Sequence, residues 1–169
     1  ARVLPLPGVR AREGGGAPVA WSHRIVGPGI LTQKRRVPAG ATVDPAAVAG
    51  ARELPYDIPN LQVEWVNKDF GVPLGFWRSV GSSQNAFVTE SFIDELAHLA
   101  GKDPFEYRRA LLGRSPRHKA VLEMAAARAD WGSAVPAGRG RGRSPKPLPG
   151  ARWRRASRLT DVSTMAMEA

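Results

Sequence analysis

One arginine in this chain combines a suitable side chain with a suitable setting for acting on a bound molecule. Arg78 directly follows the aromatic pair Phe76 and Trp77, in a stretch, residues 73–81, that contains one proline and two glycines. A guanidinium group stays charged at neutral pH and presents a planar fork of hydrogen-bond donors, so it can polarise a carbonyl group or stabilise an anion. The residue types also permit a simpler interpretation, in which Arg78 pairs with a neighbouring carboxylate.

Ionisable side chains further along the chain have the spacing of one helix face. Glu90, Asp94 and His98 are four residues apart. Glu95 and His98 have the spacing that carboxylate-bridged di-iron bundles use twice. Only one copy of that motif is present, so we expect no metal site. We interpret these residues as a solvated helix face on which Asp94 and His98 are neighbours.

A helix is predicted directly after the Arg78 segment. It begins at residues 83–85 and ends near residue 100, where Gly101 supplies a left-handed stop. The apolar positions that predict this helix recur at spacings of four, four and three residues: Val88, Phe92, Leu96 and Leu99. Arg78 is therefore expected on a loop that feeds a helix start, a common place for binding residues.

Two further helices are predicted, over residues 104–112 and 116–130. Asp103 and Ser115 are favourable capping residues, and each is followed by a proline, which suits the first position of a helix. The sequence therefore predicts three consecutive helices after the Arg78 loop.

Alternating apolar residues predict two strands, over residues 19–26 and 61–66. The stretch between them, residues 32–55, is interpreted as mostly linker with at most a helical turn at residues 45–49. Residues 1–17 show no period and end in three consecutive glycines, so we interpret them as a flexible leader.

The composition limits the kinds of function that are open to the chain. Its 169 residues include no cysteine, which excludes disulfides, thiolate zinc sites and cysteine-held iron–sulfur clusters in this chain. No apolar run approaches the roughly 20 residues that span a bilayer, and the N-terminal residues lack the hydrophobic region of a signal peptide. We expect a soluble protein without a membrane span, and the bacterial cytoplasm and periplasm both stay open.

The net charge of +10 is unevenly distributed. Residues 54–137 are nearly neutral, whereas residues 138–158 contain eight arginines and lysines and no carboxylate. Glycine alternates with arginine over residues 138–143, and such segments can bind phosphate backbones through charge alone. After Gly142 the hydrophobic period ends, which indicates either a disordered tail or a change of reading frame. We predict a basic, disordered tail over residues 138–169.

A long, ordered set of motifs surrounds Arg78. It consists of a strand lead-in, an aromatic-Arg loop, a helix and an Asp-Pro start to the next helix. Its members are Tyr56, Ile58, Pro59, Asn60, Trp77, Arg78, Gly81, Gln84, Phe87, Glu90, Asp103 and Pro104. This set resembles the molybdopterin-binding large subunits of the xanthine dehydrogenase and aldehyde oxidase family, most closely the isoquinoline 1-oxidoreductase beta subunit type. The resemblance extends over about residues 18–142 and is most specific over residues 56–112.

The resemblance implies roles for four residues. Arg78 is expected to orient the substrate and stabilise the transition state, and Trp77, Gly81 and Gln84 are expected to contact the molybdenum cofactor. Ser79 departs from the glycine that often follows this arginine in xanthine dehydrogenase-type loops, although serine fits the isoquinoline type. The cofactor class is therefore better defined by the resemblance than the substrate is.

Two functions of different classes follow. The first is a fragment of a molybdenum hydroxylase, an oxidoreductase that hydroxylates N-heteroaromatic rings or oxidises aldehydes and passes electrons to the iron–sulfur clusters of a partner subunit. No glutamate here matches the family's catalytic base, and the other cofactor loops are missing, so the chain alone is expected to be inactive. The alternative is a small basic protein that binds nucleic acid through residues 138–158.

The expected fold class is α+β. It combines two or so strands with three consecutive helices in a partial molybdopterin-binding domain over residues 18–137, between disordered ends. A third possibility is a truncated product without a function of its own. In that case the two predicted strands would have unpaired edges, and a two-stranded ribbon is marginally stable in water.

Overall fold

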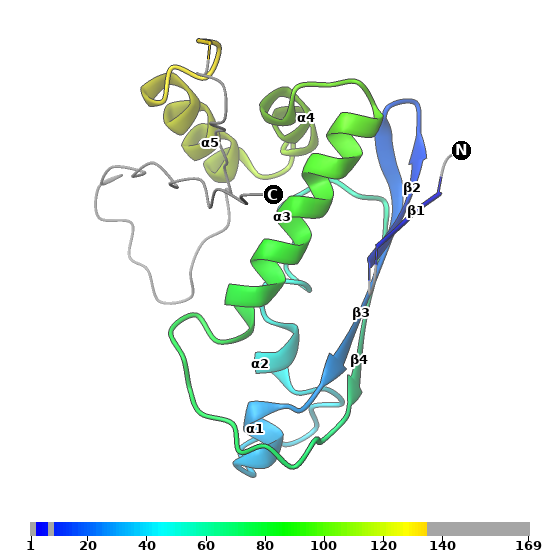
Figure 1. The fold of residues 1–169 in the computed structure, drawn as a ribbon, viewed down its shortest axis with the longest axis vertical. Coiled ribbons are helices and arrows are strands. Elements are labelled where there is room, and N and C mark those ends of the chain that lie inside the picture. Colours follow the sequence, from blue (N-terminus) through cyan, green and yellow to red (C-terminus); the bar gives the residue numbers. More distant parts are fainter. Residues whose placement is uncertain (1–2, 7–8, 135–169) are drawn as a thin grey trace, which may run out of the picture.

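The structure is a computed structural model that describes residues 3–6 and 9–134. The sheet has four strands: β1 (Val3–Leu6), β2 (Val9–Gly14), β3 (Ala17–Gly27) and β4 (Asn60–Asn67). The first three strands pair antiparallel in chain order, and β4 pairs parallel with β3. The helices lie on one face of this sheet (Figure 1). The predicted α+β class is confirmed.

The two predicted strands correspond to β3 and β4, which lie side by side. On β3 the odd-numbered residues Trp21 and His23 are buried, whereas Arg24 and Val26 are exposed, as the alternation of apolar residues predicts. Trp21 is paired in register with Leu61 of β4. Because parallel strands need a long crossover connection, the stretch between β3 and β4 carries two short helices rather than a tight turn.

The interpretation of residues 1–17 as a flexible leader is wrong for the part that the structure describes. β2 pairs with β3, and its residues Val9 and Ala11 are 0% and 3% exposed. The three glycines are not a linker, because Gly15 and Gly16 adopt positive φ angles in the turn between β2 and β3. The strands are short and contain proline and arginine, so their pairing with β3 determines their structure more than their own pattern does.

Five helices accompany the sheet in the described residues: α1 (Ile30–Gln33), α2 (Pro45–Val48), α3 (Gly81–Leu99), α4 (Pro104–Leu111) and α5 (Pro116–Arg128). The last three confirm the predicted consecutive helices. α4 begins where the capping signals predict, because the Asp103 carboxylate accepts hydrogen bonds from the backbone N–H groups of Phe105 and Glu106. α3 starts at Gly81, two residues before the predicted range.

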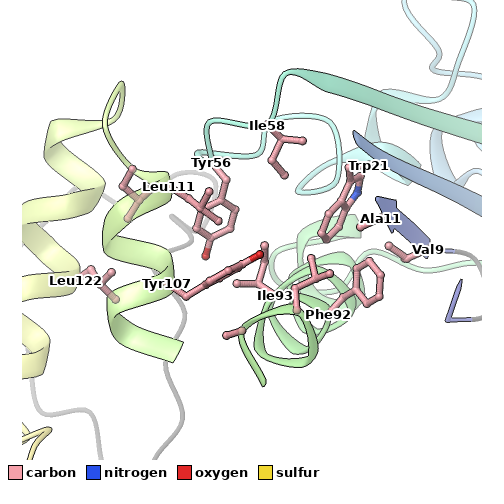
Figure 2. Packing of buried hydrophobic residues seen from close by; sticks show 13 residues of the cluster. Val9, Ala11, Trp21, Tyr56, Ile58, Phe92, Ile93, Tyr107, Leu111 and Leu122 are labelled. Atoms are coloured by element: carbon pink, nitrogen blue, oxygen red, sulfur yellow. The ribbon is translucent and has the colours of Figure 1, made fainter. Parts of the chain in front are cut away.

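One hydrophobic core joins the sheet to α3, α4 and α5 (Figure 2). The Trp21 ring of β3 meets the Phe92 ring of α3 edge-on, with 5.0 Å between the ring centres. Such aromatic pairs stabilise a core beyond the apolar area that they bury. The cluster extends from Val9 on β2 to Leu122 on α5, so β2, β3 and the helices α3, α4 and α5 share one core.

A buried polar network crosses this core. Arg108 of α4 is 1% exposed, and its Nε donates to the Glu90 carboxylate of α3 over 3.0 Å. The Tyr56 hydroxyl donates to the same carboxylate oxygen over 2.7 Å. Arg108 also donates to the Asp94 carboxylate. The interpretation of Glu90 as part of a solvated face is therefore wrong, because Arg108 approaches it from the next helix; the Asp94 side chain stays half-exposed, and its ion-pair partner is Arg108.

The ionisation of the network follows from its burial and its charges. Burial raises the pKa of Tyr56 well above its usual value, and the negative charge of Glu90 adds to this effect, so the phenol stays a donor. Burial acts against the charge of Arg108, but the hydrogen bond to Asp94 and the negative charges of Glu90 and Asp94 outweigh it, and the pKa of Arg108 is raised. Arg108 therefore stays charged in the core.

No helix in the described part of the chain is long and apolar enough to cross a membrane. The predicted basic tail, residues 138–169, and the predicted domain end at residue 137 lie outside the described residues.

Replacing Arg108 by methionine is expected to lower the free energy of unfolding by about 3–5 kcal/mol, because the Glu90 carboxylate would stay buried without its cation. Urea unfolding measures the change. Arg109→Met is the matched control, since Arg109 is half-exposed and pairs with Glu106 at the surface, and it should change stability by less than about 1 kcal/mol. Equal losses for the two variants would show that the buried network does not depend on the charge of Arg108.

The ion pair between Asp57 and Arg114 makes the free energy of unfolding depend on pH in the acidic range. The Arg114 hydrogen bonds hold the pKa of Asp57 below its usual value. A lowered folded-state pKa means that the pair stabilises the protein above the unfolded-state pKa of about 4 and loses this effect as the pH falls through the folded-state value.

Asp57→Asn is therefore expected to lower the free energy of unfolding at pH 7, and the difference from the parent chain should shrink towards pH 3. Urea unfolding at several pH values measures this, with Asp130→Asn at an exposed carboxylate as control. A difference that stays constant from pH 7 to pH 3 would show that the charge of Asp57 does not matter.

Candidate functional site

The predicted site lies on the long connection between β4 and α3, residues 68–80, which extends past α1 and away from the sheet before it enters α3 (Figure 1). This placement agrees with the predicted position of Arg78 between a strand end and a helix start. A turn closes the connection, because the Val80 N–H donates to the Trp77 carbonyl over 3.1 Å.

The structure separates the four predicted site residues into two groups. Trp77 is 81% exposed, and Arg78 and Gln84 are also exposed. Gly81, in contrast, is buried. The Ser83 hydroxyl donates to the Arg78 carbonyl over 3.0 Å, which fastens the turn to the first turn of α3, where Gln84 lies. The first three side chains are therefore available to a bound molecule, and Gly81 is not.

The Arg78 guanidinium has no carboxylate partner within the described residues, where the ion pairs of the arginines involve Arg24, Arg52, Arg108, Arg109 and Arg114. The simpler interpretation, a loop arginine that is neutralised by a neighbouring carboxylate, is therefore not supported in this part of the chain. An exposed guanidinium without an anionic partner can bind a carboxylate, phosphate or carbonyl oxygen from outside.

The backbone beside Arg78 is strained. Ser79 and Val80 adopt φ angles of 71° and 44°, although neither is a glycine, and such angles are unusual for a β-branched residue. Ser79 has the left-handed backbone conformation that glycine adopts most easily, so a glycine would suit this position. Strain of this kind persists only where the surroundings hold the backbone in place.

Gly81 holds the start of α3 against α2. A methyl group on Gly81 would collide with the carbonyl oxygen of Ala46, so only glycine allows this approach. The Asn85 side chain adds two hydrogen bonds, because its amide donates to the carbonyls of Ala47 and Ala49 over 2.9 and 3.0 Å. The packing of two helices explains the glycine without a cofactor contact.

One residue that supports this arrangement was not predicted. Asp44 is 1% exposed, and its carboxylate accepts hydrogen bonds from the Thr32 backbone over 2.9 Å, the Thr32 hydroxyl over 3.2 Å and the Ala46 N–H over 2.9 Å. It thereby caps α2 and ties it to α1. The signal was present in the sequence, since Asp44 precedes Pro45 just as Asp103 precedes Pro104.

Around the site the chain exposes many large apolar side chains. They are Phe70 (63% exposed), Val72 (62%), Phe76 (55%), Trp77 (81%) and Phe87 (74%), and we call them the exposed apolar set. Scattered apolar residues are normal on a surface, but here five large ones lie within 18 residues of chain.

Two further features bear on the kind of site. No group of three or more potential metal-ligating side chains occurs in the part of the chain that the structure describes. A hollow of about 500 Å³ lies over the sheet, where the small residues Ala20 and Ser22 of β3 are flanked by Arg12 and Asn60. None of the four predicted site residues lines it.

Comparison with known proteins identifies partial relatives. The chain is 33% identical over 76 residues to the beta subunit of the isoquinoline 1-oxidoreductase of Brevundimonas diminuta, a match that covers 45% of this chain and 10% of that protein. It is 39% identical over 77 residues to a nicotinate dehydrogenase subunit of Pseudomonas putida, covering 46% of this chain and 6% of that protein. The matched part of the chain thus spans a tenth or less of the length of these relatives. No family model matches it.

Solved structures give weaker similarity. The aldehyde oxidoreductase of Desulfovibrio gigas aligns with a TM-score of 0.44 and 22% identity, over 75% of this chain and 16% of that one. The aldehyde oxidoreductase of Desulfovibrio desulfuricans aligns with a TM-score of 0.40 and 21% identity. The sequence matches define the class: the chain resembles subunits of oxidoreductases over part of its length. The predicted resemblance to the isoquinoline 1-oxidoreductase beta subunit is confirmed.

Gly81→Ala is expected to destabilise the protein by about 1–3 kcal/mol, because the new methyl group must displace the Ala46 carbonyl or the start of α3. Gly75→Ala is the matched control, since a methyl group there would contact nothing. Thermal or urea unfolding compares the two variants. Alanine favours helices, so an unchanged or raised stability of Gly81→Ala would show that α2 does not constrain this position.

Proposed function

We propose that this chain is a piece of the large subunit of a molybdenum hydroxylase and carries the loop that presents Arg78 to the substrate. The observation that carries the proposal is the similarity, over 76 and 77 residues, to an isoquinoline 1-oxidoreductase subunit and a nicotinate dehydrogenase subunit. Both names refer to nitrogen-containing aromatic rings, so we propose a substrate of that class, with aldehydes as the alternative that the family resemblance implies.

The exposed apolar set supports a chain that works as part of a larger protein. A small monomer that exposes Phe70, Trp77 and Phe87 together would tend to aggregate, whereas neighbouring segments of a large subunit would cover these side chains. The proposal therefore assigns Phe70, Val72, Phe76 and Phe87 to contacts with other segments of the subunit and leaves Trp77 to the cofactor. It agrees with the small share, 10% and 6%, of the relatives' length that the chain matches.

The residues present fit a molybdenum cofactor in part. Arg78 and Gln84 expose groups that donate hydrogen bonds, which suit the anionic and oxygen-rich parts of such a cofactor. Gly81 fits less well, because it is buried against α2 and would act by positioning the start of α3. When bound, the cofactor supplies the oxidising centre of the reaction. The chain's own contribution is a fixed positive charge that orients the substrate.

The proposal makes the chain dependent on other parts. Electrons would leave through the iron–sulfur clusters of a partner subunit, and the catalytic base would come from another segment, since no glutamate of this chain matches it. The chain alone is therefore expected to show no turnover of a heteroaromatic substrate or an aldehyde with an artificial electron acceptor. Measurable turnover would contradict this division of roles.

The direct test is a chimera. Residues 56–112 of this chain replace the corresponding segment of the matched nicotinate dehydrogenase subunit of Pseudomonas putida, expressed with the rest of that enzyme, and nicotinate oxidation is measured. We expect the chimera to be active and Arg78→Ala to lower its kcat/KM by about 100-fold or more, the usual effect of losing a group that stabilises developing charge.

Arg109→Ala serves as the control in the same chimera, because Arg109 is exposed on α4 and pairs with Glu106. It should retain the activity of the parent chimera. If Arg78→Ala retains it too, Arg78 has no role in the reaction and the proposed function of the loop fails.

A further inference from the structure

The Gln33 side chain, at the end of α1, fastens the loop that leads to Arg78. Its Oε1 accepts a hydrogen bond from the Leu74 N–H over 2.9 Å. Its Nε2 donates to the Val72 carbonyl over 3.1 Å and lies 3.4 Å from the Asp69 carboxylate. We propose that Gln33 is a positioning residue for the Trp77–Arg78 turn, an inference that rests on the role of Arg78 in the proposed function.

The position of Gln33 defines how much of the loop is free to move. On the other side of the turn, Gly81 and Asn85 hold the chain against α2. With Leu74 fastened by Gln33, six residues, 75–80, connect the two fixed points. Without Gln33 the free connection would begin at the end of β4, near residue 68. A shorter span between fixed ends samples fewer conformations, so Gln33 restricts where Arg78 can lie.

Both fixed points depend on one buried carboxylate. Asp44 ties α1 to α2 through Thr32 and Ala46, so the helix that carries Gln33 and the helix that receives Gly81 keep a fixed distance. The strained φ angles of Ser79 and Val80 are consistent with this arrangement, because a short span between two fixed ends can hold an unfavourable backbone in place.

The chemistry of the contact requires a primary amide. Leu74 needs an acceptor and Val72 needs a donor, and the glutamine side chain supplies both from adjacent atoms. Glutamate has the same length but can only accept when it is ionised, and it would also repel Asp69. Methionine has a similar length and provides neither hydrogen bond. Gln33→Glu therefore removes only the hydrogen bond to Val72, whereas Gln33→Met removes the hydrogen bonds to both Val72 and Leu74.

The experiment is amide hydrogen exchange and NMR on the 169-residue chain and its variants Gln33→Met and Gln33→Glu. We expect the Leu74 amide to exchange at least about tenfold faster in Gln33→Met, the effect of one lost hydrogen bond, and to regain protection in part in Gln33→Glu. The Trp77 indole N–H signal, assigned with Trp77→Phe, should shift in Gln33→Met. Gln62→Met, at an exposed glutamine on β4, is the control and should change neither.

Unchanged Leu74 exchange or an unchanged Trp77 signal in Gln33→Met would overturn the proposal, provided that urea unfolding shows the variant to be folded. If Gln33→Met unfolds, Gln33→Glu replaces it; partial protection of the Leu74 amide with a shifted Trp77 signal would support the proposal, and an unchanged Trp77 signal would overturn it. No substrate enters this experiment, so its failure is distinct from failure of the Arg78 chimera, which tests the proposed function itself.

Discussion

The buried carboxylate of Glu90 is the constraint on which the arrangement of this protein depends. A carboxylate inside a core needs a cation and hydrogen-bond donors, and here they come from Arg108 on α4 and Tyr56 before β4. Desolvation of both charges offsets much of their attraction, so the network adds less to net stability than to geometry. Helix α4 must lie where Arg108 reaches α3, and the lead-in to β4 must bring Tyr56 to the same point.

The sequence predicted the elements whose signals are local. The proline and capping residues before α4 and α5, and the apolar spacing along α3, placed three helices to within about two residues, which is the precision of helix boundaries in general. β1 and β2 escaped prediction because their structure comes from pairing with β3, a contact between distant residues. Glu90 was assigned to a solvated face for the same reason: its partner Arg108 lies 18 residues further along the chain.

The features of the candidate site also divide into those that local sequence signals predict and those that depend on contacts between distant residues. The loop position and exposure of Arg78 follow from the proline and glycines around it and from the helix that begins after it. The burial of Gly81 against Ala46, the hydrogen bonds from Thr32 to Asp44 and the contact of Gln33 with Leu74 do not, because each joins segments that are 12 to 41 residues apart. Short helices give too few periods to be recognised, and their stability comes from tertiary contacts.

The turn that carries Trp77 and Arg78 is exposed, whereas packing and hydrogen bonds hold the segments on both sides of it. This arrangement is relevant to the proposed role of Arg78. Gln33 is half-buried, and Gly81 and Asn85 are buried, whereas Trp77 and Arg78 at the tip of the turn are exposed. A guanidinium that is to act on a substrate must lose freedom before binding, since ordering it during binding would cost part of the affinity. In the proposed function, the hydrogen bonds and packing that hold the turn would provide this order on one side of the substrate. The cover on the other side must come from whatever contacts Phe70, Phe76 and Phe87, because a charge stabilises a transition state most effectively where water is excluded.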